Sequence, residues 1–210
     1  MVARRIIDYA ISIFQDTTSL AYASVIDLGG LLGLDLARST RASSPFKRAL
    51  EIRKARLGPE DSFIAYSLNI ALAYTEIGEL ELAYTTHEQA INLRLKAKSN
   101  RIGNSYSNMA SLLLRLGRPD EAEEILARCS SLKDFTDETF LSTGNPRFSG
   151  DMVLLSRIRR AQGQPTEALR LASKTLAFRR ELLGNRLKTC DSQYDVESML
   201  LNDGHVSSAL

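Results

Sequence analysis

Apolar residues recur along most of the chain at the spacing of one face of an α-helix. Between residues 62 and 78 they include Ile64, Leu68 and Ala71, and residues 80–96 show the same spacing. Apolar side chains three or four residues apart lie on one side of a helix. The sequence contains no strand-like segments joined by a hairpin turn. The pattern therefore predicts an all-α protein built from pairs of helices joined by tight turns.

A glycine followed five residues later by an alanine recurs along the chain. The four glycines are 39, 46 and 41 residues apart. Glycine adopts the left-handed conformation that ends a helix, and proline suits the first turn of the next one. We therefore expect a first helix before each glycine and a second helix after it, with the alanine allowing close helix contact. The glycine and alanine pairs are Gly78 and Ala83, Gly117 and Ala122, Gly163 and Ala168, and Gly204 and Ala209.

Four ten-residue segments form a second repeated marker, starting at Ala49, Ala90, Cys129 and Thr175. Each begins with a small residue, has a bulky apolar residue three places on, and then a base. The bases lie toward the C-terminal halves of predicted second helices, where positive charge suits the helix dipole. We therefore interpret them as structural. They are Arg53, Arg94, Lys133 and Arg179.

The two markers together resemble the tetratricopeptide repeat, and the period of about 42 residues resembles its kinesin-light-chain variety. Similar arrays form C-terminal parts of fungal nucleotide-binding signalling proteins. The resemblance implies a right-handed α-solenoid of antiparallel helix pairs that binds proteins. His87 replaces a large aromatic residue of the consensus. The matching positions in two successive repeats are Ile70, Ala71, Tyr74, Gly78, Leu80, Ala83, His87 and Ala90, then Tyr106, Met109, Ala110, Leu113, Gly117, Ala122, Leu126 and Cys129.

The markers also predict how the chain is divided. Residues 1–19 form an N-terminal helix, either separate or the end of a preceding repeat, and residues 20–210 form the array. The last repeat is truncated, so either the chain is a fragment of a longer array or that end docks on something. The predicted units are residues 20–57, 62–97, 101–133, 149–183 and 188–210.

Composition narrows the range of partners. The net charge of +2 does not indicate a nucleic-acid or membrane surface. No apolar segment reaches the length of about 18 residues that spans a bilayer. Cys129 and Cys190 form no C-x-x-C pair, so we expect reduced thiols and a cytoplasmic protein. The sequence thus favours a protein or peptide partner, with no nucleic acid and no membrane.

No constellation of catalytic residues stands out. His87 lies on an inward helix position, which favours a core histidine over a catalytic base. We find no metal-ligand spacing, no nucleophile elbow and no phosphate-binding loop, so the sequence indicates no cofactor. The segment GGLLG at residues 29–33 contains no lysine, and we interpret it as a site of close helix packing. These features predict that the chain is not an enzyme.

Binding requires an exposed face, which first helices provide in a stack of helix pairs. Asn69 and Asn108 occupy equal positions one repeat apart, where each amide could either hold the main chain of an extended peptide or bond a neighbouring helix. Acidic residues lie toward one end of this face and basic ones toward the other, a pattern that fits either a ligand or a solvated surface. The candidate residues are Asp27, Leu31, Asn69, Leu72, Glu76, Asn108, Ser111, Arg115, Arg157 and Arg160.

The sequence therefore predicts a non-catalytic scaffold that belongs to a larger signalling or assembly protein. One alternative is a helical regulatory domain of an enzyme that binds a small ligand. Another is an oligomerisation module that acts through the C-terminal end. The linker at residues 134–150 is either an inert insertion or a functional loop.

Overall fold

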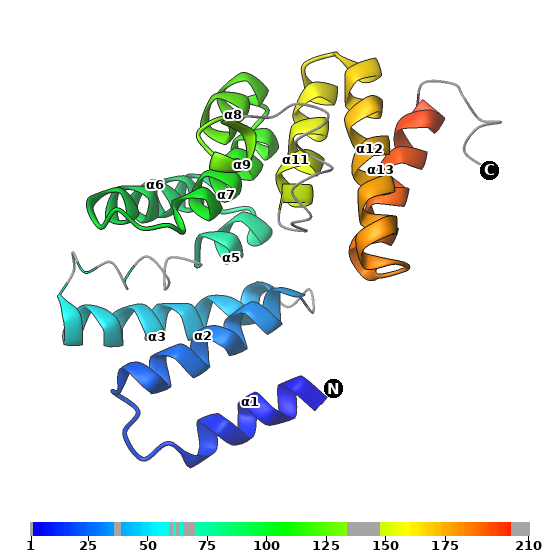
Figure 1. The fold of residues 1–210 in the computed structure, drawn as a ribbon. Helices are drawn as coiled ribbons and strands as arrows, with labels where there is room; N and C mark the ends of the chain where they lie inside the picture. Colours follow the sequence, from blue (N-terminus) through cyan, green and yellow to red (C-terminus); the bar gives the residue numbers. More distant parts are fainter. Residues whose placement is uncertain are drawn as a thin grey trace. The chain divides into compact units, whose positions relative to one another are not determined.

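A computed structural model of the chain describes residues 2–35, 39–58, 61, 64, 70–133 and 148–202, and every regular element in these ranges is a helix (Figure 1). The chain divides into two compact parts, an N-terminal half (Met1–Leu112) and a C-terminal half (Leu113–Leu210). Helix α7 crosses the boundary between them. The helices are α1 (Val2–Ile13), α2 (Leu20–Asp35), α3 (Ser39–Leu57), α5 (Ile70–Ile77), α6 (Leu80–Lys96), α7 (Ile102–Arg115), α8 (Pro119–Leu126), α9 (Ser130–Lys133), α11 (Phe148–Ala161), α12 (Pro165–Leu183) and α13 (Leu187–Asn202).

The glycine turns have the predicted backbone conformation. Gly78, Gly117 and Gly163 have φ angles of 84°, 71° and 74°, a region that other residues rarely adopt. After each glycine, the next amide donates to the carbonyl oxygen five residues before it, at 2.9 Å in all three turns. This bond closes the first helix, so each glycine ends one helix and lets the next begin two residues later.

The alanines that follow these turns are fully buried. Ala83, Ala122 and Ala168 each have 0% of their surface exposed. Pro119 and Pro165 lie in the first turn of α8 and α12, as the sequence predicts. A side chain larger than a methyl group has no space at the alanine positions, so the spacing of five residues after the glycine is a packing requirement.

Neighbouring helices of the N-terminal half share successive apolar clusters. Ala23 and Ile26 of α2 pack with Ala49 and Ile52 of α3. A second cluster joins α3 to α5, and a third joins α3 to α6. The predicted close packing at GGLLG is confirmed, because a Cβ atom on Gly30 would lie 2.8 Å from the ring of Phe46.

Neighbouring helices of the C-terminal half also share apolar clusters. Met152 of α11 packs against Leu171 and Phe178 of α12. Ala168 of α12, together with Ala172, packs against Met199 of α13. Each second helix thus contacts its own first helix on one side and the next first helix on the other, which is how a helix-pair repeat builds its core.

One second helix differs from the prediction. Lys133, expected in the C-terminal half of a long second helix, lies at the end of the separate four-residue helix α9. Helix α8 ends at Leu126, and the amide of Cys129 donates to the Leu126 carbonyl oxygen at 2.9 Å in the intervening turn. Most of the predicted linker, residues 134–147, lies outside the described residues.

Candidate ligand-binding face

The first helices repeat one arrangement of exposed and buried positions. In α5, α7 and α11, residues nine, six and two places before the turn glycine are exposed or half-buried wherever the structure describes them, whereas residues seven and five places before it are buried. The described outward residues are Leu72 and Glu76 of α5, Asn108, Ser111 and Arg115 of α7, and Leu154, Arg157 and Ala161 of α11.

In the C-terminal half this edge is charged. Arg157 of α11 forms an ion pair with Asp195 of α13 at 2.8 Å, and the Arg157 side chain remains 50% exposed. Arg160 lies on the same helix and is exposed. Sequence reasoning missed Asp195, although it stands nine residues before Gly204 and so occupies the same repeat position as Asn108.

Asn108 is half-buried on α7. Asn69 lies outside the described residues. The pairing of the two asparagines therefore stays a prediction.

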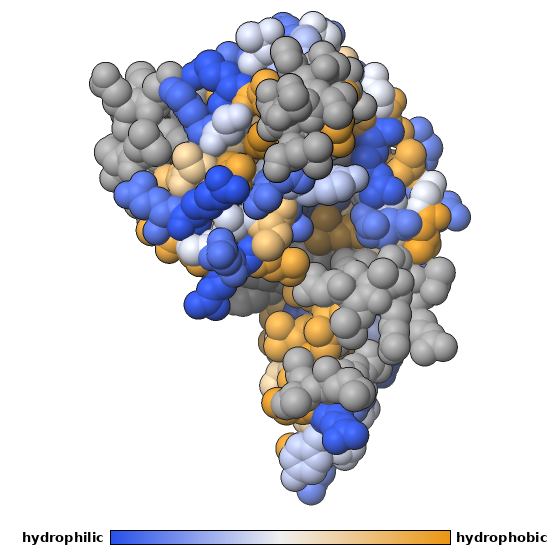
Figure 2. Space-filling view, turned by 90° about the vertical axis from the view of Figure 1, so that its right-hand side faces the viewer, coloured by the Kyte–Doolittle hydropathy of each residue, from blue (hydrophilic) through white to orange (hydrophobic). Residues whose placement is uncertain are grey.

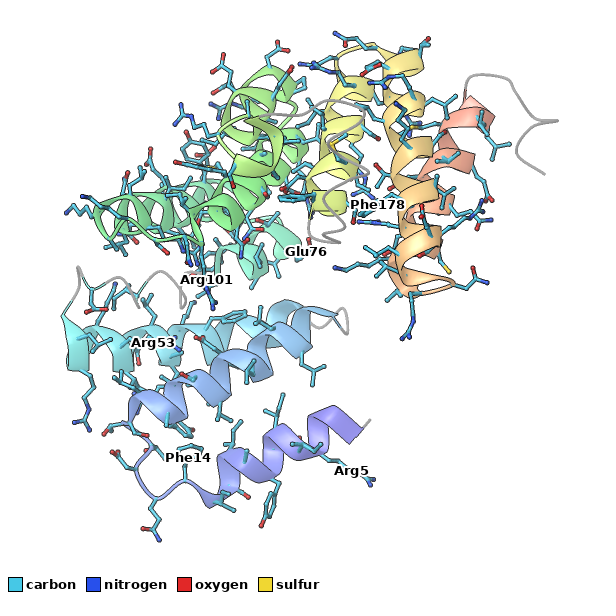
Figure 3. All side chains as sticks on the ribbon, in the orientation of Figure 1. Arg5, Phe14, Arg53, Glu76, Arg101 and Phe178 are labelled. Carbon is cyan, nitrogen blue, oxygen red and sulfur yellow. The ribbon has the colours of Figure 1, made fainter. Side chains whose placement is uncertain are left out.

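Two candidate residues of α2 hold helices together. Asp27 is 6% exposed, and its carboxylate accepts a hydrogen bond from Arg53 of α3 in a buried ion pair (Figure 3). Leu31 is half-buried and packs against the cluster of Phe46 and Ile70. The Asp27 carboxylate is buried in the helix contact, where Oδ2 pairs with Arg53 and Oδ1 has no partner among the described residues, so it does not reach solvent and we leave Asp27 and Leu31 out of the candidate face.

Comparison with known proteins accounts for this repeated arrangement. Family models described as tetratricopeptide repeat match residues 61–134 and 152–186, together 109 of the 210 residues. The chain belongs to the tetratricopeptide repeat family. A search of curated proteins found no significant match.

Solved structures with this fold include kinesin-light-chain-like tetratricopeptide repeat proteins. A putative kinesin light chain with TPR-like repeats from Podosopora anserina has 19% identity and a TM-score of 0.65, covering 93% of this chain and 92% of the other. BtubC (BKLC) from P. vanneervenii has 16% identity and a TM-score of 0.67, covering 90% and 76%. MamA from Desulfovibrio magneticus RS-1 has 14% identity and a TM-score of 0.52, covering 89% and 88%. The predicted all-α solenoid fold of kinesin-light-chain type is confirmed.

Three of the four recurring bases, Arg53, Arg94 and Arg179, are buried. Arg94 donates to Ser105 of the following first helix. Arg179 donates to Ser192 of the following first helix at 2.7 Å and to Ser149 of its own first helix at 2.9 Å. Ser105 and Ser192 both stand twelve residues before a turn glycine. These bases are structural, as predicted, but they act by bonding successive helices and not mainly through the helix dipole.

His87 is a core residue of its repeat, as predicted. Its side chain is 2% exposed, and its Nε2 atom has no hydrogen-bond partner among the described residues. Burial, assisted by the charge of Arg94, lowers the pKa of His87 from 6.5 to about 4. The imidazole is therefore neutral at pH 7 and lies inside the helix packing.

Other chemical sites are not evident in the described ranges. Their His, Cys, Asp and Glu side chains form no group of three that could hold a metal ion. Cys129 is buried and Cys190 is exposed, and neither forms a disulfide within the part of the chain that the structure describes. Of the helices that the structure describes, none has the length and apolar character needed to cross a membrane.

Proposed function

We propose that this tetratricopeptide repeat chain is a non-catalytic scaffold that binds a protein or peptide along the outward edges of its first helices. The supporting observation is that the same three positions are exposed or half-buried in α5, α7 and α11 wherever the structure describes them, whereas the positions seven and five places before the turn glycine are buried. Within each half of the chain, such an edge offers polar and charged contacts to an extended chain. We also propose that the scaffold is part of a larger signalling or assembly protein, with the unit boundaries predicted from the sequence.

The basic edge of α11 favours acidic ligands. Arg157 and Arg160 present guanidinium groups, which bind carboxylates through two parallel hydrogen bonds. The Arg157 side chain is 50% exposed although it pairs with Asp195, whose side chain is 16% exposed, so an incoming carboxylate can approach the exposed side of the Arg157 guanidinium.

Apolar contact accompanies the charge. Tyr194 of α13 is 72% exposed and is the direct chain neighbour of Asp195. Figure 2 shows hydrophobic side chains next to strongly hydrophilic ones over the visible surface. A ligand with acidic residues and one bulky apolar residue would use both kinds of contact. In the N-terminal half, half-buried Asn108 offers an amide that can donate to and accept from a peptide main chain.

Charge reversal on α11 tests the proposal. A fluorescent peptide rich in glutamate, and a matched peptide with lysine at the same places, are titrated with the chain and followed by fluorescence anisotropy. The Arg157→Glu, Arg160→Glu variant should lose binding of the acidic peptide by at least about tenfold. The control variant, Arg128→Glu with Arg186→Glu, makes the same charge change at exposed positions off the first helices. Equal losses in the two variants would refute the assignment.

A second function rests on a different observation. Leu187, Tyr194 and Leu201 of α13 are 78%, 72% and 52% exposed and stand seven residues apart, so they share one side of the helix. We propose oligomerisation through this C-terminal helix as the alternative to peptide binding. Light scattering should then show a dimer or larger species that a Tyr194→Asp, Leu201→Asp variant converts to monomer. A monomeric wild-type chain at high concentration would exclude it.

A further inference from the structure

An ion pair joins two first helices in the C-terminal half. The side chain of Arg157 on α11 donates from one nitrogen, Nη2, to both carboxylate oxygens of Asp195 on α13, at 3.0 and 2.8 Å. The two residues are 38 positions apart in the chain. An ion pair such as Arg170 with Glu167 lies within one turn of a helix. The pair of Arg157 with Asp195 instead links two successive repeats.

Asp195 stands at a position that elsewhere belongs to the candidate ligand-binding face. It lies nine residues before Gly204, as Asn108 lies nine residues before Gly117. Its side chain is only 16% exposed, whereas the side chain of Arg157 is 50% exposed. Asp195 therefore presents to Arg157, from within the chain, the same chemical group that an acidic ligand would bring.

The nitrogen that Asp195 holds is the one that a bound carboxylate needs. A guanidinium offers two pairs of parallel N–H bonds, Nε with Nη2 and Nη1 with Nη2, and both pairs include Nη2. An incoming carboxylate can approach the exposed side of Arg157, but it forms two parallel bonds only after Asp195 releases Nη2. Asp195 competes well because it belongs to the same chain and does not lose the freedom that a separate ligand loses on binding.

A third charged group sets how the pair can be tested. Arg179 of α12 is buried and donates to Ser192 and to the Lys188 carbonyl oxygen. Burial lowers the pKa of Arg179, and the charges of Asp191 and Asp195 oppose that shift. Replacement of Asp195 alone therefore leaves Arg179 with one acidic neighbour. Asp191 provides a matched control on the same helix.

We propose that Asp195 is an internal competitor for Arg157, which holds the guanidinium nitrogen that an acidic ligand needs and so weakens the binding of that ligand. The inference rests on the proposed binding of acidic ligands along α11. A neutral residue at position 195 removes the repulsion between Asp195 and the carboxylates of the ligand. It also removes the charged hydrogen bond to Arg157, which is about twice as strong as a neutral one.

Neutralising Asp195 tests the proposal. The glutamate-rich fluorescent peptide is titrated with the intact chain and its variants, and anisotropy gives the affinity. Asp195→Asn should bind the peptide at least about threefold more tightly than the wild type does. Asp191→Asn makes the same charge change, and within the described part of the chain Asp191 forms no ion pair with Arg157, so its gain should be smaller.

An Arg157→Gln background separates competition from general repulsion. There the gain from Asp195→Asn should fall to that from Asp191→Asn, because the internal pair is already absent. In the wild-type chain, the side-chain carboxyl carbon signal of Asp195 should shift on peptide binding more than that of Asp191. This measurement answers the question even if the Asp195→Asn variant fails to fold.

Equal gains from the two asparagine variants, or a gain from Asp195→Asn that persists without Arg157, would overturn the proposal. Weaker binding by Asp195→Asn would also overturn it, because Asp195 would then hold Arg157 in place for the ligand. If Arg157→Glu with Arg160→Glu abolishes binding but Asp195→Asn leaves the affinity unchanged, the proposed function stands and the competitor falls. If neither the wild type nor Asp195→Asn binds the peptide, both fall.

Discussion

Replacing His87 with leucine should stabilise the chain and remove part of its sensitivity to acid. His87 is buried with an unpartnered Nε2 atom. Leu126 occupies the same position in the next repeat, nine residues after the turn glycine, and is fully buried there. An unsatisfied buried polar atom costs about 1–3 kcal/mol, so the leucine variant should gain about that much at neutral pH.

The pH dependence follows from the pKa of His87. The folded chain binds the proton near pH 4 and the unfolded chain near pH 6.5. Between these values the unfolded state binds more protons, so the free energy of unfolding falls as the pH falls from 6.5 to 4. The difference amounts to about 3 kcal/mol in total, of which about 2 kcal/mol is lost by about pH 5.

Protonation of Asp27 changes the free energy of unfolding in the opposite direction over much of the same pH range. Burial raises the pKa of Asp27 from 3.8 to about 6, although its bond to Arg53 offsets part of the effect. The folded state therefore binds the proton first as the pH falls from 6 to 3.8, which stabilises it. Both the wild-type chain and the leucine variant keep Asp27, so its contribution cancels when the two are compared.

Urea unfolding followed by circular dichroism gives the free energy of unfolding of the wild-type chain and of the His87→Leu variant at about pH 7.5 and about pH 5. The stability gap between the leucine variant and the wild type should widen by about 2 kcal/mol at the lower pH. An unchanged gap would show that His87 does not titrate with a depressed pKa, and the assignment of a buried neutral imidazole would fail.

Other substitutions test the packing of the repeats. Ala122→Leu should destabilise by about 1–3 kcal/mol through overpacking, seen as a lower melting temperature in calorimetry, whereas Ala127→Leu at an exposed position should not. Arg53→Ala should cost about 3–5 kcal/mol in urea unfolding because Asp27 is left buried without its partner, and adding Asp27→Leu should restore most of that stability. Gly117→Ala should cost about 1 kcal/mol because the glycine has a φ of 71°, and a variant with unchanged stability would argue against the left-handed turn.

The sequence was most informative where a local rule decides the structure. Steric contacts limit which residue can stand at a single position. A glycine is required where the chain closes a helix, and an alanine is required where a neighbouring helix comes close. Gly117, Ala122 and His87 could therefore be placed from spacing alone. Helical periodicity also fixes which residues of a first helix share a side, and the assignment of one side as the binding edge stays a prediction.

Pairings between helices could not be predicted in the same way. Asp27 fell on the predicted open face, yet it pairs with Arg53 inside the contact of α2 and α3. Periodicity shows which residues share a side, but it does not show which side another helix covers. From the sequence alone, Arg94 was interpreted as a residue that suits the helix dipole. Its bond to Ser105 could not be predicted, because that bond depends on the geometry of a neighbouring helix.

Mapping a bound acidic peptide by amide chemical shifts tests the central claim most directly. Peptide binding along the first helices of the C-terminal half predicts that the largest shifts fall on the outward edges of α11 and α13, including Arg157 and Asp195, with little change along α12. Shifts confined to the second helices, or none at saturating peptide, would contradict it.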